Sequence, residues 1–157
     1  MCMLMFRITD PPDVLLRLKN GMDAAEPSSN SVSARNLWRL SSMLEDEGYA
    51  DMAKETLGAF EAEVEQFPYT FAGILGSVVM GRLGLRGVIL IGGAKEHKDV
   101  LKKIRGCVRP NTTIVAIDEV RGGWLRERNQ LLRGTDPKGV QVMVCEGKTC
   151  HIGAEHI

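Results

Sequence analysis

The sequence predicts a mixed α/β fold in which helices come first and a small sheet follows. Between residues 31 and 83, apolar side chains recur three and four positions apart, which is the spacing of an amphipathic helix. After Gly84, short uninterrupted apolar runs alternate with helical segments, the pattern of buried parallel strands joined by crossover helices. The content of 44% hydrophobic and 25% charged residues is that of a globular protein, so we expect a packed core.

The first helix is predicted over residues 31–44. Leu37 and Trp38 lie on its broad apolar face. Asn30 or Ser31 can cap it, because a side-chain oxygen at that position accepts a hydrogen bond from a backbone N–H of the first turn.

Two more helices are predicted after a break at Gly48. The second covers residues 49–66, has Leu57 and Phe60 on its apolar face and shows the clearest helical periodicity in the chain. Proline ends it, and the third helix covers residues 69–83. The third helix contains three glycines, each of which costs about 1 kcal/mol relative to alanine in a helix. We therefore expect close packing around those glycines.

The second half of the chain predicts a parallel three-stranded sheet with right-handed crossovers. The expected strands are residues 88–91, 113–117 and 140–145, and the expected helices between them are residues 95–105 and 122–132. The predicted organisation is an irregular segment over residues 1–30, a helical part over 31–84 and a small α/β part over 85–157.

Charge and hydropathy argue against binding to nucleic acid or membrane. The 20 basic and 20 acidic side chains cancel, so no net field attracts a polyanion. Four arginines surround Trp124, but Glu127 and Asp136 interrupt that basic cluster. The longest weakly polar stretch, residues 71–80, is shorter than the roughly 20 apolar residues that span a bilayer. The first six residues do not form a secretory signal, and a cytoplasmic location is expected.

The cysteines form no recognised metal or redox motif. Cys145 and Cys150 are separated by four residues, which departs from the spacing of zinc knuckles and of C-x-x-C pairs, so neither a metal nor a cofactor is expected. Two interpretations stay open for this pair. The cysteines are reduced buried thiols, or they close a small disulfide loop in an oxidising compartment, which makes them the redox candidates.

Other polar positions are expected to be structural. Gly92-Gly93 follows a strand and predicts a tight turn rather than a phosphate site, because the remaining residues of a phosphate-binding motif are missing. Asp118 and Glu119 follow the second strand and are expected to cap its end. His97 has charged neighbours and is expected to be a solvated surface residue.

One segment resembles a known family. Residues 23–40, DAAEPSSNSVSARNLWRL, are similar to the pattern D-G-A-x-P-S-x-N-S-V-x-x-x-N-L-x-R-L of the spermatogenesis-associated protein 20 family, whose members have an N-terminal thioredoxin-like domain. The similarity continues at residues 88–93 and at residues 142–150, the latter similar to a C-terminal Y-V-C-E-N-x-x-C segment of the family. These segments occur in the order of the family.

The resemblance implies a part of a larger architecture. In the family, an (α/α)₆ toroid similar to N-acylglucosamine 2-epimerases follows the thioredoxin-like domain, and this chain resembles only the C-terminal end. The resemblance therefore implies a truncated homologue, linked to spermatogenesis and without catalytic activity of its own. The alternatives are a fragment of a carbohydrate-active toroid enzyme and a protein-interaction module.

The resemblance also implies a partner and a candidate site. The expected partner is the missing N-terminal portion of the parent protein, or another protein that covers the exposed helix face. Without it, the stripes at Leu37/Trp38 and Leu57/Phe60 are expected to be partly exposed. No catalytic residue is predicted. Loops at one end of the toroid would line a cavity, which gives the ligand-binding candidates Arg17, Lys19, Asp23, Glu26, Ser28, Asn30 and Ser31.

A competing explanation applies to these rim residues. Asp, Ser and Asn before a helix commonly satisfy backbone groups by capping. Ala24 also stands where the family usually has glycine, which restricts positive φ values in this loop.

Overall fold

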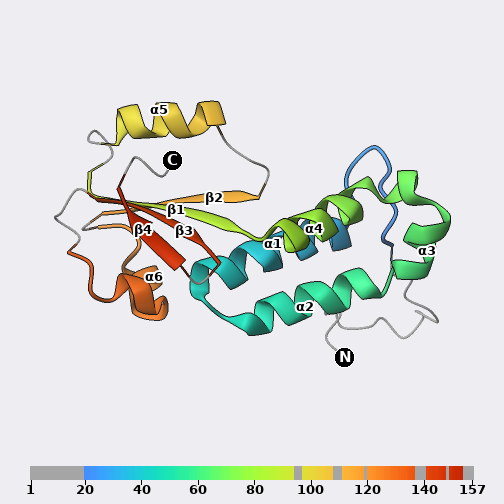
Figure 1. Ribbon diagram of the computed structural model, residues 1–157. Helices are drawn as coiled ribbons and strands as arrows, with labels where there is room; N and C mark the ends of the chain where they lie inside the picture. The colour runs from blue at the N-terminus through green and yellow to red at the C-terminus, as the bar shows by residue number, and fades with distance from the viewer. Residues whose placement is uncertain are drawn as a thin grey trace. The chain divides into compact units, whose positions relative to one another are not determined.

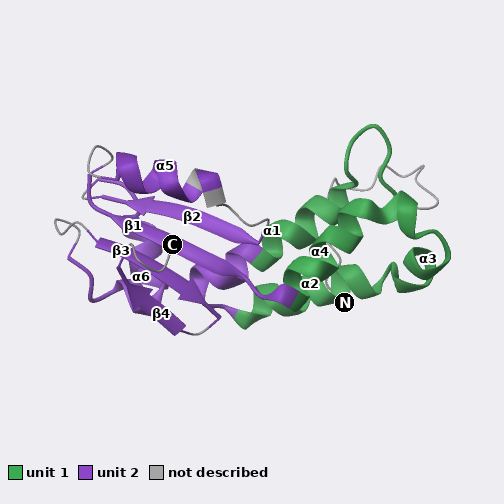
Figure 2. Cartoon of the chain, turned by 45° about the horizontal axis from the view of Figure 1, so that its top comes forward, with its two compact units in different colours: residues 1–38, 47–82 green, residues 39–46, 83–157 purple. Residues whose placement is uncertain are grey.

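The computed structural model describes residues 20–93, 97–107, 111–118, 120–136, 141–147 and 149–153 (Figure 1). The chain divides into two compact units (Figure 2). Unit 1 comprises residues 1–38 and 47–82, and unit 2 comprises residues 39–46 and 83–157. We describe each unit by itself.

Unit 1 is helical. Its elements are α1 (Ser29–Leu44, whose last residues belong to unit 2), α2 (Glu47–Gly58), α3 (Glu61–Gln66), the 3₁₀ helix η1 (Pro68–Phe71) and α4 (Ala72–Leu83). The prediction of one helix over residues 49–66 is wrong, because α2 ends at Gly58 and α3 begins at Glu61. Glycine is a poor helix former, and Phe60 leaves helical geometry to turn its ring into the core, where the side chain is 4% exposed.

The core of unit 1 contradicts the expected exposure of the helix stripes. Leu37, Leu57 and Phe60 are all buried, and only Trp38 of the four is half-buried. The cover comes from within the unit, because Phe71 and the following α4 pack against the stripes of α1 and α2.

Helices α1 and α4 approach each other closely at small residues. A Cβ atom on Gly81 would lie 2.5 Å from the Trp38 ring, and one on Gly73 would lie 2.6 Å from Ser31 Oγ. Between the two glycines, Ser77 Oγ lies 3.2 Å from the Ser31 carbonyl oxygen and 3.0 Å from the Gly73 carbonyl oxygen, either of which can accept its hydrogen bond. The expectation that close packing holds this glycine-containing helix is confirmed at Gly73 and Gly81.

Unit 2 contains a four-stranded mixed sheet of order β2-β1-β3-β4. Its elements are β1 (Arg86–Ile91), α5 (Lys98–Cys107), β2 (Thr112–Ile117), α6 (Gly123–Arg128), the 3₁₀ helix η2 (Gln130–Leu132), β3 (Gln141–Glu146) and β4 (Thr149–Ile152). Strands β1 and β2 are parallel, as predicted. The prediction of a parallel third strand is wrong, because β3 is antiparallel to β1, and β4 was not predicted.

The register shows how β3 comes to run against β1. Ile117 at the end of β2 and Gln141 at the start of β3 both pair with Ile91, the last residue of β1. The segment that joins β2 to β3 therefore begins and ends at the same end of the sheet, and β3 runs in the direction opposite to β1 and β2.

Alternate residues of the sheet face two separate apolar layers, and α5 and α6 lie on opposite faces of it (Figure 1). Val88 and Leu90 of β1 pack with Ile104 of α5 on one face. Ile89 and Ile91 pack on the other face with residues of α6, η2 and the end of α1. The period of two in a strand produces this division and explains why β1 is a continuous apolar run in the sequence.

Candidate functional site

The Asp23 carboxylate joins the first turns of two helices. Asp23 Oδ1 accepts a hydrogen bond from the N–H of Ser28, which precedes α1, at 2.8 Å. Asp23 Oδ2 accepts one from the N–H of Gly73, at the start of α4, at 2.6 Å. The Asp23 N–H donates to the Thr70 carbonyl at 2.8 Å, which fixes the backbone that carries the carboxylate. A negative charge is favourable here because the N-terminus of a helix carries partial positive charge.

Two serines complete this cluster. Ser28 is the N-cap of α1, because its Oγ accepts a hydrogen bond from the Ser31 N–H at 3.2 Å. The prediction of Asn30 or Ser31 as the cap is wrong, since α1 already begins at Ser29. Ser31 Oγ donates to the Ser28 carbonyl at 2.8 Å and lies 3.5 Å from Asp23 Oδ1. Both serines are buried, at 7% and 1% exposure. We call Asp23, Ser28, Ser31 and Gly73 the helix joint.

The electrostatics of the helix joint favour the ionised carboxylate. Burial raises the pKa of Asp23, but the N–H groups of Gly73 and Ser28 and the hydroxyls of Ser31 and Ser28 together outweigh burial. The pKa of Asp23 therefore lies below its ordinary value. A group of this kind is a poor general acid or base near neutral pH, because it holds no proton to give and binds one weakly.

The other rim residues that the structure describes, Glu26 and Asn30, do not bind the Asp23 carboxylate through the hydrogen bonds of this cluster. Glu26 is exposed, and Asn30 Nδ2 donates to the Asn20 carbonyl at 2.8 Å. Arg17 and Lys19 lie outside the described residues. Gly73 belongs to the helix joint but was not among the predicted site residues, since nothing near it in the sequence points to a carboxylate 50 residues earlier.

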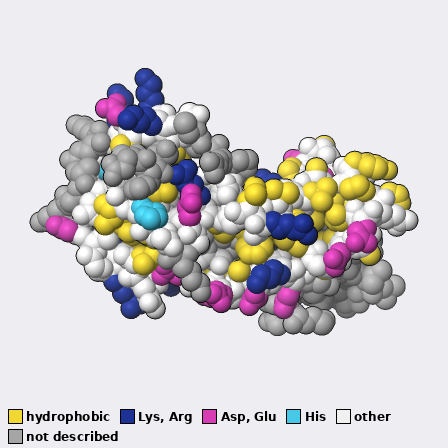
Figure 3. All heavy atoms as spheres, viewed as in Figure 1, with side chains coloured by type: hydrophobic (Ala, Val, Ile, Leu, Met, Phe, Trp, Pro, Cys, Tyr) yellow, Lys and Arg dark blue, Asp and Glu magenta, His cyan; other side chains and the backbone are white. Residues whose placement is uncertain are grey.

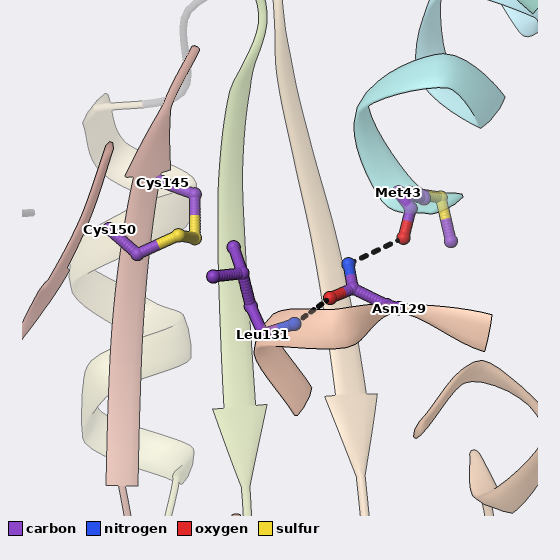
Figure 4. The surroundings of a disulfide bond; sticks show 5 residues. All are labelled: Met43, Asn129, Leu131, Cys145 and Cys150. Atoms are coloured by element: carbon purple, nitrogen blue, oxygen red, sulfur yellow. Dashed lines mark hydrogen bonds between the residues drawn. A yellow bond between two sulfur atoms is a disulfide. The ribbon is translucent and has the colours of Figure 1, made fainter. Parts of the chain in front are cut away.

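The two redox candidates form a disulfide bond between β3 and β4. The sulfur atoms of Cys145 and Cys150 are 2.06 Å apart. The two residues are direct partners in the antiparallel register. Figure 4 shows the disulfide near Leu131 and Asn129, and Asn129 Nδ2 donates to the Met43 carbonyl at 2.9 Å. Of the two interpretations of this pair, the structure has the disulfide loop.

Comparison with known proteins finds relatives for part of the chain. Spermatogenesis-associated protein 20 from Mus musculus is 32% identical over 108 residues, which is 68% of this chain and 14% of the relative. The protein of the same name from Homo sapiens is 27% identical over 142 residues, or 87% of this chain and 18% of the relative.

The chain is distantly related to spermatogenesis-associated protein 20. It spans only 14% to 18% of the length of these relatives. No family model and no solved structure matches it. The present structure therefore provides the description of the mixed helix and sheet architecture.

A small pocket in unit 2 lies beside the disulfide. Its volume is about 20 Å³, and its lining includes Ser42, Glu45, Thr113 and Cys145. That volume accommodates about one water molecule and is far below the several hundred Å³ of a typical small-molecule site. It offers no room for a sugar ring of the kind expected for a carbohydrate-active toroid.

The structure contradicts the prediction for His97 and agrees with the prediction for Asp118. His97 is only 2% exposed, and its Nε2 lies 2.7 Å from the Ile91 carbonyl, so the prediction of a solvated surface residue is wrong. His97 directly precedes α5, and its ring lies against the end of β1. The charged residues next to His97 in the sequence give no sign of this burial. Asp118 Oδ1 accepts hydrogen bonds from the N–H groups of Val120 and Arg121, as expected for a turn after a strand, while Glu119 lies outside the described residues.

Other functional classes find little support in the described part of the chain. Two arginines near Trp124 donate side-chain hydrogen bonds to backbone carbonyls. Arg126 donates to Thr135, and Arg133 donates to Glu127. No group of three or more His, Cys, Asp or Glu side chains in the described ranges is placed to hold a metal ion. Within the same ranges, every helix is too short or too polar to cross a bilayer.

Proposed function

We propose that this chain is the counterpart of the C-terminal part of spermatogenesis-associated protein 20, truncated relative to it, and that it binds protein rather than catalysing a reaction. The observation that carries the proposal is the second apolar face of α4. One face of this helix is buried through Ile74, Ser77 and Met80. The outward face is also apolar, and it consists of Ala72, Leu75, Gly76 and Val79 at helical spacing.

The composition of α4 supports a covered position. Arg82 is its one charged residue, and Val79 is 52% exposed. A helix that is apolar on both faces is typically surrounded by protein. Val32 and Met22 of unit 1 are exposed as well, and Figure 3 shows apolar side chains gathered on the helical unit. We call Ala72, Leu75, Gly76 and Val79 the outer face of α4; Leu75 is half-buried and the other three residues are exposed.

The occupant that we propose for the outer face of α4 is the helical portion that precedes the matched segment in a spermatogenesis-associated protein 20. The relatives have more than four-fifths of their length outside the match. If that portion is a toroid of paired helices, its last helices are neighbours of the segment that corresponds to α4. The uncharged residues of this face suit an apolar helix as a neighbour, and the guanidinium of Arg35 lies beside them at Gly76.

The helix joint supports a non-catalytic role. Both Asp23 oxygens accept backbone hydrogen bonds, and Ser31 Oγ donates to a carbonyl. A nucleophile requires a general base within hydrogen-bond reach, and a carboxylate already bound to two helix termini is not free to serve as one. The carbohydrate-active alternative needs free polar groups around a cavity, which the helix joint does not supply.

A binding experiment tests this proposal. The chain is titrated calorimetrically into the mouse protein from which the matched segment has been deleted, with Val79→Asp as the test variant and Val120→Asp as the matched control. Val120 is 92% exposed and lies on a loop of unit 2. We expect binding by the parent chain, at least about tenfold weaker binding by Val79→Asp, which corresponds to 1.4 kcal/mol or more, and unchanged binding by Val120→Asp.

Two results would contradict the proposal. One is the absence of binding by a chain that is folded by circular dichroism, and the other is equal binding by Val79→Asp. Sedimentation of the chain alone tests for a different occupant. If the chain dimerises and Val79→Asp abolishes the dimer, the outer face of α4 is assigned to a second copy of the chain. Stabilisation of the chain by N-acylglucosamine, with no binding to the mouse protein, would favour the carbohydrate-active alternative.

A further inference from the structure

The Cys145–Cys150 disulfide lies at a position where two antiparallel strands are closest. The Gly153 N–H donates to the Val142 carbonyl at 2.9 Å, so residues 142 and 153 form a hydrogen-bonded pair. Because hydrogen-bonded and non-hydrogen-bonded pairs alternate along an antiparallel ladder, Cys145 and Cys150 form a non-hydrogen-bonded pair. Their Cα atoms are 4.0 Å apart. The backbone register therefore brings the two sulfur atoms together, and the covalent bond joins strands that are already paired.

The two sulfur atoms have unequal surroundings. Cys145 is on β3, which has a neighbouring strand on each side, and its Cβ lies beside Gly87 of β1. Cys145 also lines the small pocket in unit 2. Cys150 is on β4, the last strand of the sheet order, which pairs on one side only. Both cysteines are half-buried and pack against the same apolar cluster, but Ile152, two residues after Cys150 and on the same face of β4, is 65% exposed.

We propose that Cys145–Cys150 is a thiol–disulfide exchange site of the folded protein, with Cys150 as the sulfur that an external dithiol attacks. The geometry supports this assignment because an attacking thiolate must approach a sulfur along the S–S axis, and the open edge of the sheet gives that access at Cys150. Cys145 Sγ, on the inner strand, is then the leaving group.

The exchange balances in two steps. A thiolate of the external dithiol attacks Cys150 Sγ, which breaks the intramolecular S–S bond, forms a mixed disulfide and releases Cys145 as a thiolate that takes up a proton. The second thiolate of the dithiol attacks its own sulfur in the mixed disulfide and releases Cys150, which also takes up a proton. The protein disulfide gains two electrons, the dithiol becomes a disulfide, and the reverse reaction re-forms the bond.

Exchange changes how firmly β4 is held. In the disulfide form β4 is attached to β3 by four residues of backbone pairing and by the covalent bond. In the dithiol form only the pairing remains, and a short edge strand is the least protected kind of strand. We expect backbone amides of β4 to exchange with solvent at least about tenfold faster in the dithiol form, while those of β1 change little.

The first test measures reduction without unfolding. The chain is incubated with dithiothreitol without denaturant, its free thiols are alkylated at intervals, and modified cysteines are located by peptide mass spectrometry. Circular dichroism and hydrogen exchange of β1 are followed in parallel. We expect Cys145 and Cys150 to become alkylated together while β1 stays protected. Resistance of the pair until the sheet unfolds would overturn the proposal.

The second test distinguishes the two sulfur atoms. Cys145→Ser leaves the Cys150 thiol and Cys150→Ser leaves the Cys145 thiol, both in a Cys2→Ser, Cys107→Ser background that removes the other cysteines. Reaction rates with dithiobis(nitrobenzoate) are compared in folded and in urea-unfolded protein. We expect the Cys150 thiol to react at least about tenfold faster than the Cys145 thiol only when folded, because the position of Cys150 on the edge strand, and not its intrinsic reactivity, separates the two. Equal folded rates, or a faster Cys145, would overturn the assignment.

Discussion

The two units of this chain are stabilised in different ways. Unit 1 has its closest contacts at small and polar residues, where Gly73 and Gly81 let α1 and α4 meet and Asp23 binds the starts of both helices. Unit 2 has apolar layers on both faces of its sheet and a covalent bond at the edge. The helical unit therefore adds specific hydrogen bonds to backbone groups to its apolar core, whereas the sheet adds a covalent bond to its buried apolar area.

The polar cluster of unit 1 and the disulfide of unit 2 both lie in segments whose sequence pattern is similar to the family. The pattern over residues 23–40 includes Asp23, Ser28 and Ser31, which form the helix joint. The similarity over residues 142–150 includes both disulfide cysteines. These residues therefore form connections within each unit, through hydrogen bonds at the helix joint and a covalent bond at the edge of the sheet.

The largest expected effect is in the apolar layer of unit 2. Leu90→Ala removes a β1 side chain that is 0% exposed and packs with Ile104 of α5 and Val142 of β3. We expect the free energy of unfolding to fall by about 3 kcal/mol, from lost burial and an unfilled cavity. Urea denaturation measures the change, and Val120→Ala, at an exposed position, is expected to stay within about 0.5 kcal/mol of the parent. A loss below about 1 kcal/mol would contradict a tightly packed sheet.

The close approach of α1 and α4 gives the next effect. In Gly73→Val the added Cβ would lie 2.6 Å from Ser31 Oγ, which is too close for van der Waals contact. The two helices must therefore move apart. We expect a loss of about 2–3 kcal/mol in thermal or urea unfolding. Gly58→Ala is the matched control because nothing lies within 4 Å of an added Cβ there, and it is expected to be neutral or to stabilise by up to about 1 kcal/mol. If both substitutions behave alike, the glycines of α4 do not set the helix separation.

The disulfide has a smaller effect on stability because it closes a short loop. Replacing both Cys145 and Cys150 by serine should lower the free energy of unfolding by about 2 kcal/mol. Cys107→Ser, which leaves the pair intact, is the control for the loss of a thiol. Denaturation without reductant measures both, and a double variant as stable as the parent would show that backbone pairing alone holds β4.

The charge of Asp23 gives the smallest effect and the clearest pH dependence. Asp23→Asn should destabilise the chain by about 1 kcal/mol near neutral pH, because an amide accepts fewer backbone hydrogen bonds than a carboxylate. A carboxylate whose pKa is lowered in the folded state contributes stability above its unfolded pKa of about 3.9, and that contribution is lost as the pH falls through the folded pKa. The difference between parent and variant should therefore shrink below about pH 4 and should be constant above about pH 5. A difference that is independent of pH would exclude the ionised joint.

Several parts of the fold follow from local sequence patterns, and others do not. The apolar runs of β1 and β2 and the tight packing of the α4 glycines are consequences of local chemistry that the sequence displays. The cap of α1 lies at Ser28 and not at the expected Asn30 or Ser31. The break at Gly58 and the burial of His97 depend on where the rest of the chain goes. Strand β4 lacks a strand pattern, since it is four residues long and mostly exposed.

The candidate site shows the same division. Asp, Ser and Asn before α1 predict capping, and that part of the joint is present at Ser28. The bond from Gly73 to Asp23 crosses 50 residues, and no local pattern reports it. Sequence therefore identifies which residues can form a polar cluster, but only the three-dimensional structure shows that the cluster is filled by the backbone of a second helix.

The central claim is that the Asp23 cluster is a closed helix joint, and the backbone amides of Gly73 and Ser28 test it most directly. A series of ¹⁵N–¹H correlation spectra from about pH 6 to pH 2.5 follows both amides, which donate to the carboxylate. We predict that both titrate together with a midpoint below the ordinary aspartate pKa of about 3.9, and that millimolar N-acylglucosamine moves neither. Amides that do not respond to pH, or that shift on addition of the sugar, would contradict the account and restore this loop as a ligand site.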